Sequence, residues 1–247
     1  GGHESGRLAP ATGAIRESGG LTAGSERWGV AADGRDEWRV WFTERAGNRI
    51  GSLNPASGTV AEYALGSPNS LPSGLSASSV WLGGIEHWYL WFAEPGSNLL
   101  GRMRLADYSL ADLAPLTPGS APQDVVWEGG VPWITQRAAN QIATFGFGTT
   151  ALWTEVPVST PDSEPYGITL QGSDVVWFTE RAGNRVGRYQ VSTDRLIEYA
   201  LPTPGSQPTD ITVDAAGCAW YTASAADRLG RLCPSAMGAT YLPLVLR

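Results

Sequence analysis

Two aspartates occupy positions at which other copies of a repeated sequence carry glycine. The repeat occurs five times, and the position in question is filled in turn by Gly29, Gly74, Asp124, Gly167 and Asp210. Two carboxylates that converge on one axis could hold Ca²⁺ or Mg²⁺, because these cations prefer oxygen ligands. Alternatively, each carboxylate accepts hydrogen bonds from backbone amides at the start of its own strand. We therefore expect no cofactor, with Mg²⁺ or Ca²⁺ as the alternative.

The residue just before each of these positions is a second candidate for ligand binding. In chain order these residues are Trp28, Ser73, Gln123, Tyr166 and Thr209. The Trp28 and Tyr166 rings could stack on a sugar or grip a side chain, although ordinary loop packing is the alternative. We expect the mouth of a common channel to be lined by Trp28, Gln123, Asp124, Tyr166 and Asp210.

A glutamate recurs after the repeated aromatic residues of three copies. These glutamates are Glu44, Glu94 and Glu180, and Arg45 and Arg181 follow two of them. A repeated charge of this kind usually belongs to a structural ion pair or to a solvated rim, and contributes little by itself. We interpret the glutamates as a polar rim and assign them no catalytic role.

The composition excludes several classes of function. The net charge is −7 and charges of both signs are interspersed, so there is no basic patch to bind nucleic acid. No apolar run approaches the ~18 residues that a membrane-spanning helix needs. The sequence also contains no glycine-rich phosphate loop, no nucleophile elbow and no Cys/His spacing typical of a metal site.

The elements that must position these candidates repeat with a period in the low forties. The recurring tryptophan lies at positions 41, 91, 133, 177 and 220, which gives steps of 50, 42, 44 and 43 residues. Short apolar runs separated by turn residues at this period are typical of a β-propeller. In the fourth copy the pattern predicts strands at 166–170, 175–179, 185–190 and 195–200.

The tryptophan-bearing strand is apolar on both faces, with Val176 and Phe178 on one side and Trp177 on the other. A strand of this kind is buried on both sides. In a propeller the neighbouring blades supply both covers, so we interpret the repeated tryptophan as packing between blades. An insertion at 79–88 lengthens the connection between the first two strands of the second copy.

Both ends of the chain resemble outer strands of a blade. Residues 6–17 match residues 51–62 at a constant offset of 45, so residues 1–20 read as half a blade. Residues 239–247 form an apolar segment that also reads as an outer strand. We predict one domain over 1–247, an all-β propeller of four-stranded blades, with five blades favoured over six and a terminal strand closing the ring.

The two cysteines flank a predicted hairpin. Cys218 precedes the strand of Trp220, and Cys233 ends the next strand. We expect them to face each other and to form a disulfide, with two buried free thiols as the alternative. A disulfide favours an oxidising compartment, and we therefore expect a secreted protein, extracellular or at the cell surface.

Three motifs together resemble the virginiamycin B lyase family. They are Trp-Phe-Thr-Glu-x-x-x-Asn-x-Ile-Gly at 41–51, Pro-x-Gly-Ile at 165–168 and Gly-x-x-x-Glu-Tyr at 58–63. The resemblance implies a seven-bladed propeller that opens cyclic depsipeptides of the streptogramin type by β-elimination. It also implies a histidine base at a Pro-His-Gly-like position, a nearby carboxylate and a Mg²⁺ ion.

The five positions equivalent to that histidine are the Trp28, Ser73, Gln123, Tyr166 and Thr209 series, which contains no histidine. The two histidines of the chain are His3, near the start, and His87, in the insertion. A general base must reach the proton it removes. The sequence therefore favours a non-catalytic propeller over a lyase.

We expect this propeller to act as a binding or assembly module. Its partner would be a protein or a second copy that docks on a terminal strand, because an unpaired strand can add to another sheet. A glycan or a peptide is a further possible ligand. The alternatives are a Mg²⁺-assisted lyase acting on a cyclic depsipeptide and a glycan-binding module.

Overall fold

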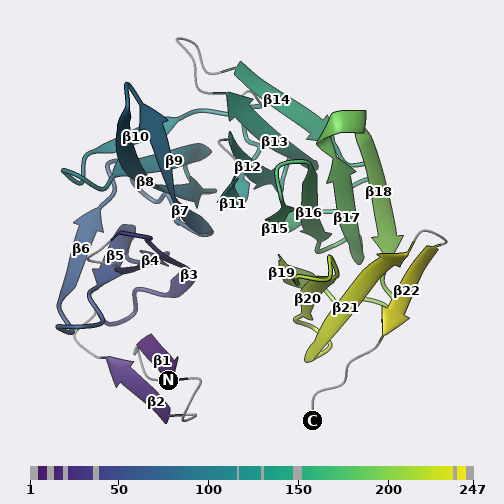
Figure 1. The fold of residues 1–247 in the computed structure, drawn as a ribbon, viewed down its shortest axis with the longest axis horizontal. Coiled ribbons are helices and arrows are strands. Elements are labelled where there is room, and N and C mark those ends of the chain that lie inside the picture. Colours follow the sequence, from purple (N-terminus) through teal and green to yellow (C-terminus); the bar gives the residue numbers. More distant parts are fainter. Residues whose placement is uncertain are drawn as a thin grey trace.

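The computed structural model describes residues 5–9, 14–18, 22–35, 39–115, 117–128, 131–146, 152–235 and 238–242. Its sheets are antiparallel, and five of them have four strands each. These five sheets follow one another around an axis as the blades of a propeller (Figure 1). The predicted fold class and the preference for five four-stranded blades are therefore confirmed.

Each blade is a meander of four successive strands. The first contains β3 (Arg27–Ala32), β4 (Val40–Glu44), β5 (Arg49–Leu53) and β6 (Val60–Ala64). The second contains β7 (Leu75–Leu82), β8 (Ile85–Glu94), β9 (Leu99–Arg104) and β10 (Leu110–Leu113). The third contains β11 (Pro122–Glu128), β12 (Val131–Gln136), β13 (Gln141–Gly146) and β14 (Leu152–Pro157).

The fourth blade contains β15 (Pro165–Gln171), β16 (Val175–Glu180), β17 (Arg185–Gln190) and β18 (Arg195–Ala200). These bounds agree with the predicted strands to within one residue, and the short 3₁₀ helix η1 (Val191–Thr193) joins the last two. The fifth contains β19 (Pro208–Val213), β20 (Ala219–Ala223), β21 (Arg228–Ser235) and β22 (Gly238–Leu242). The predicted insertion at 79–88 extends β7 and β8 into a long hairpin.

The N-terminal strands do not complete the last blade. Strands β1 (Ser5–Ala9) and β2 (Ala14–Ser18) pair with each other in a separate two-stranded sheet. The fourth strand of the last blade is β22, which pairs with β21. Of the two terminal segments that resemble outer strands, the C-terminal one therefore supplies the outer strand of the last blade, because it follows β21 directly along the chain.

Packing between blades forms the core, as predicted from the tryptophan-bearing strands. Trp41, Trp91 and Trp177 are 0% exposed and Trp133 is 4% exposed. Each lies in a separate apolar cluster that joins its own blade to the next one. On the next blade, the cluster includes an aliphatic residue from the first strand. We call the tryptophan-bearing side of a blade its outgoing face and the opposite side its incoming face.

The two ends of this series of blades expose faces that are buried elsewhere. Leu229 of the fifth blade is 38% exposed, although its equivalents Ile50, Leu100, Ile142 and Val186 are each 0% exposed. Val30 of the first blade is 70% exposed, whereas its equivalents Leu75, Val125, Ile168 and Ile211 are between 3% and 8% exposed. An outgoing face at one end and an incoming face at the other are thus open to solvent.

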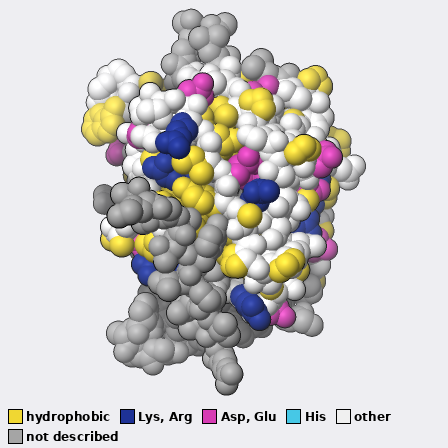
Figure 2. Space-filling view, turned by 90° about the vertical axis from the view of Figure 1, so that its right-hand side faces the viewer, with side chains coloured by type: hydrophobic (Ala, Val, Ile, Leu, Met, Phe, Trp, Pro, Cys, Tyr) yellow, Lys and Arg dark blue, Asp and Glu magenta, His cyan; other side chains and the backbone are white. Residues whose placement is uncertain are grey.

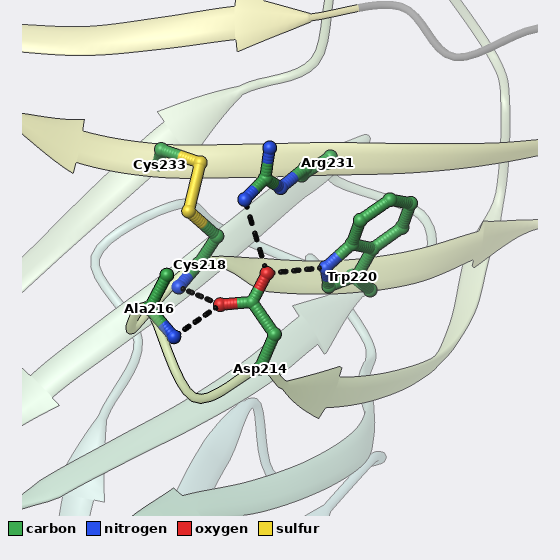
Figure 3. The surroundings of a disulfide bond; sticks show 6 residues. All are labelled: Asp214, Ala216, Cys218, Trp220, Arg231 and Cys233. Carbon is green, nitrogen blue, oxygen red and sulfur yellow. Dashed lines mark hydrogen bonds and ion pairs between the residues drawn. A yellow bond between two sulfur atoms is a disulfide. The ribbon is translucent and has the colours of Figure 1, made fainter.

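The predicted disulfide is present and joins two neighbouring strands of the fifth blade. Cys218, just before β20, bonds to Cys233 in β21 (Figure 3). Asp214 lies beside it and accepts hydrogen bonds from the Trp220 indole at 2.8 Å and the Arg231 guanidinium at 3.1 Å. Hydrogen bonds from these side chains and from nearby amides hold the Asp214 pKa at about 2.

The surface agrees with the interspersed charges of the sequence. On the side shown in Figure 2, both Arg and acidic side chains lie among neutral and apolar ones. No helix in the described parts of the chain is long and apolar enough to cross a membrane.

Candidate functional site

The first strands of the five blades surround a central cavity of about 410 Å³. These strands, β3, β7, β11, β15 and β19, lie closest to the axis (Figure 1). The cavity is lined by all five residues expected at the channel mouth, namely Trp28, Gln123, Asp124, Tyr166 and Asp210. Residues from four different blades are thus brought to one site because they occupy the same position of the repeat.

A hydrogen-bonded threonine fixes the position of most of these strands. The hydroxyls of Thr43, Thr135 and Thr179 each accept an amide N–H from the first strand of their own blade and donate to a carbonyl of a following blade. The amides belong to Gly29, Asp124 and Gly167, at 2.8, 3.1 and 2.9 Å. The carbonyls belong to Ser73, Tyr166 and Thr209, at 2.7, 2.6 and 3.2 Å.

This role of threonine was not predicted from the sequence. The signal was available, because threonine recurs in the Trp-Phe-Thr-Glu motif at 43 and 179 and again at 135 and 222. In the second blade Ala93 takes this place, and there the Ser73 hydroxyl makes a bond to the carbonyl of Gln123 at 2.6 Å. Where the motif is interrupted, the hydroxyl thus comes from the segment that leads into the first strand.

Asp124 is the most perturbed group of the cavity. Its Oδ1 accepts the Val125 amide at 2.8 Å and its Oδ2 accepts the Ile168 amide of the next blade at 3.1 Å. Desolvation by the cavity walls raises the Asp124 pKa to about 7, against the lowering effect of these two amides; the charge of Asp210 adds to the rise. Asp124 can therefore change its charge near neutral pH.

Asp210 has the local role that was the alternative to metal binding. Its Oδ1 accepts the amide of Ile211 at 2.9 Å, as Asp124 does with Val125. Within the described ranges, no group of three His, Cys, Asp or Glu side chains lies together as metal ligands would. Two carboxylates supply only part of the roughly six or more oxygen ligands that Mg²⁺ or Ca²⁺ takes, so Asp124 and Asp210 alone do not make up the metal site that the family resemblance implies.

The two aromatic residues lie at the mouth beneath arginines. Trp28 is 53% exposed, and the Arg45 guanidinium lies 5.2 Å from the centre of its ring. The Arg181 guanidinium lies 5.4 Å from the centre of the Tyr166 ring. Trp28 is thus half-exposed, and a cation covers one face of its ring.

The repeated glutamates do not form a rim. Glu44 and Glu180 are 0% exposed and Glu94 is 1% exposed, and none of them lines the central cavity. The rim interpretation is therefore wrong, because the glutamate side chains at the ends of these strands turn inward between strands. Burial raises the pKa of each of them, and for Glu180 the neighbouring Glu198 raises it further, to about 8.

His87, the histidine of the insertion, is not among the residues that line the central cavity. His87 lies in β8 and pairs with Val80 in the long hairpin of the second blade. No histidine is among the residues that line the central cavity, and His3 lies outside the described residues. An imidazole is therefore absent from the described lining of this cavity.

Comparison with known proteins extends the description from fold to family. Ring-like stacking of four-stranded antiparallel blades defines the class as a β-propeller. The model of the virginiamycin B lyase family matches residues 6–242, so the chain belongs to that family.

Solved structures agree with this assignment. Virginiamycin B lyase from Staphylococcus aureus superposes with a TM-score of 0.83 at 28% identity, over 99% of this chain and 78% of that one. A streptogramin B lyase superposes with a TM-score of 0.82 at 27% identity, over 99% and 77%. Periplasmic gluconolactonase from Pseudomonas aeruginosa, at 14% identity and a TM-score of 0.70, shares the fold over 98% and 76%.

One curated relative matches locally. Virginiamycin B lyase from Bacillus licheniformis is 49% identical over 41 residues, which is 17% of this chain and 14% of that protein. The match therefore covers a small part of the relative's length, and it supports the repeat type more than any shared active site.

We predict that Glu180→Gln stabilises the protein at alkaline pH. The pKa of Glu180 in the folded protein, about 8, lies above the ordinary 4.5. The protonated carboxyl therefore contributes its full stabilisation of the folded state below pH 4.5, and this stabilisation is lost as the pH rises through 8. Gln136 occupies this position in the third blade. The free energy of unfolding of the variant should exceed that of the parent at pH 9 by on the order of 3 kcal/mol, and the gap should close near pH 4.5.

Urea unfolding at both pH values measures this difference. The matched control is Glu86→Gln, which removes an exposed carboxyl from the long hairpin and should follow the parent protein at each pH. Parallel pH profiles for the parent and Glu180→Gln would show that Glu180 is not held in its protonated form.

Proposed function

We propose that this member of the virginiamycin B lyase family is a non-catalytic binding module whose ligand enters the central cavity. The observation that carries the proposal is the lining of that cavity, in which Trp28, Gln123 and Tyr166 occupy the positions equivalent to the family's histidine. Aromatic and amide side chains can bind and orient a ligand, but they do not remove a proton from carbon near neutral pH.

The aromatic pair indicates what kind of ligand the cavity takes. Trp28 and Tyr166 line the cavity together with the aliphatic residues Leu75, Val125 and Ile168, which lie in the first strands of the second, third and fourth blades. A mouth of this composition suits a peptide side chain or a sugar ring, each of which has an apolar face and polar edges. A glycan-binding module is one form of this proposal.

We place this activity outside the cytoplasm, at the cell surface or in the extracellular space. The support is the disulfide between Cys218 and Cys233, because such bonds persist mainly in oxidising compartments. Fractionation of the producing cells checks the location, and recovery of the protein only from the cytoplasm would contradict it.

Ligand binding should depend on the two rings. Trp28→Ala and Tyr166→Ala should each weaken binding of the best ligand in a panel of short peptides and oligosaccharides by about tenfold, because stacking on an aromatic face is lost. Calorimetric titration measures the dissociation constants. Trp81→Ala is the matched control, since Trp81 is 70% exposed but lies on the long hairpin. Unchanged binding in both ring variants would contradict the proposal.

We also propose that the protein associates with a second copy of itself. The support is an apolar groove of about 310 Å³ on the fifth blade, lined by Ile211, Trp220 and Leu229 among others. In four other blades the equivalent face is buried against a β-sheet. The terminal strands β1, β2 and β22 add edges on which a sheet of another copy can pair.

Light scattering over a range of protein concentrations tests self-association. We expect the intact protein to associate and Leu229→Glu to remain monomeric, because a charge on this face opposes burial. Val131→Glu, at a residue that is 37% exposed in the third blade, is the matched control and should associate normally. If the parent protein is monomeric at every concentration, the proposal is contradicted.

The second candidate is the lyase activity of the relatives. The observation in its favour is Asp124, whose pKa of about 7 suits a general base. Against it, both Asp124 oxygens accept backbone amides, and the described lining contains no imidazole and no set of metal ligands. The geometry therefore favours binding over elimination.

An assay of ring opening decides between the two candidates. We expect no opening of a streptogramin B by the purified protein with Mg²⁺ present, under conditions in which the Staphylococcus aureus lyase is active. Opening that disappears in Asp124→Asn would instead establish the lyase and make Asp124 its base.

A further inference from the structure

Three arginines occupy the same position of the repeat at the channel mouth. Arg45, Arg137 and Arg181 directly follow the second strands of the first, third and fourth blades. The backbone amide of each donates to a carbonyl in the loop that leads into its own blade. The acceptors are Glu26, Ala121 and Glu164, at 2.8, 3.1 and 3.0 Å. These backbone hydrogen bonds therefore fix the position from which each arginine side chain extends.

The three side chains line one pocket. It has a volume of about 260 Å³, and its other lining residues are Leu71, Pro95, Gly96, Gln123 and Tyr166. None of these lining residues is acidic. Gln123 and Tyr166 also line the central cavity, so the arginine pocket and the cavity are neighbouring parts of one mouth.

Two kinds of contact show that the arginines converge. Arg181 lies over Tyr166 at 5.4 Å and Arg45 lies over Trp28 at 5.2 Å. Burial raises the Tyr166 pKa, and the charges that oppose this rise are those of Arg181, Arg45 and Arg137. All three guanidinium groups are therefore close enough to act on one phenol.

The pocket has more positive charge than its surroundings neutralise. Glu164 pairs with Arg137 at 3.3 Å and with Arg181 at 3.7 Å. Across the described residues, Arg45 has no carboxylate within ion-pair distance. Among the residues that line the pocket and their ion-pair partners, three arginines stand against one glutamate, while Asp124 and Asp210 line the neighbouring cavity.

We propose that the mouth binds a carboxylate through Arg45 and Arg181, with Arg137 held nearby by Glu164. Guanidinium groups recognise carboxylates through charge-assisted hydrogen bonds, and Glu164 already accepts one from Arg137 at 3.3 Å and lies 3.7 Å from Arg181. The uncharged body of the ligand extends past Trp28 and Tyr166 into the central cavity. This inference rests on the binding role proposed above and specifies its ligand as a small organic acid or a peptide with a free carboxyl end.

A matched pair of ligands tests the charge requirement. N-acetylphenylalanine carries the carboxylate, and its amide has the same shape without the charge. We expect the acid to bind at least tenfold more tightly than the amide. Added salt should weaken the binding of the acid but not that of the amide, because salt screens ion pairing. Calorimetric titration measures both, with inorganic phosphate as a third probe.

Matched variants assign the binding to the pocket. Arg45→Gln and Arg181→Gln should each lower the affinity for the acid by about tenfold and leave that for the amide unchanged. Arg188→Gln is the control, because Arg188 also lies over an aromatic ring, 5.7 Å from the centre of Trp177, but does not line the pocket.

Each other outcome overturns the inference in a different way. If acid and amide bind equally and Trp28→Ala weakens both, the requirement for a carboxylate is contradicted, but the proposed binding function of the cavity still stands. Binding of phosphate in preference to the acid would replace carboxylate by phosphate as the ligand group. No binding of any of the three probes would remove the anion site, and the peptide and oligosaccharide panel would still test the cavity independently.

Discussion

Burial of one blade's tryptophan against the next blade is the constraint on which the structure depends. Each outgoing face, with its tryptophan and the aliphatic residue of its third strand, needs an incoming face to cover it. A single four-stranded sheet cannot bury both of its apolar faces alone, so the blades are stable only as a stack. The exposure of Val30 and Leu229 shows the same constraint where the described stack ends.

The same stacking builds the candidate site. Threonine hydroxyls join the second strand of a blade to the first strand of the following one, and these first strands carry the cavity residues. Blade packing thus fixes how far apart Trp28, Asp124 and Tyr166 stand, although they are distant in sequence. The repeat supplies the scaffold, and departures from the repeat supply the chemistry of the mouth.

The stacking of the blades places two sets of carboxyl groups in different surroundings. Glu44, Glu94 and Glu180 are enclosed between strands, and desolvation raises their pKa values. Asp124 faces the cavity and shares its two oxygens between amides of two blades, which oppose the rise that desolvation causes. The arginines that follow the buried strands reach the mouth, so positive charge collects where the ligand would enter.

The sequence by itself determined the repeat, the strands of the fourth blade, the packing of four of the five repeated tryptophans between blades, and the pairing of Cys218 with Cys233. These follow from local periodicity and from neighbours along one hairpin. The five residues of the mouth could also be predicted, because equivalent positions of a repeat converge on the axis. Only the tertiary structure decided that the glutamates are buried, that β22 completes the last blade in place of an N-terminal strand, and that three arginines share one pocket. Each of these depends on contacts between segments distant in sequence, whose geometry the local pattern does not contain.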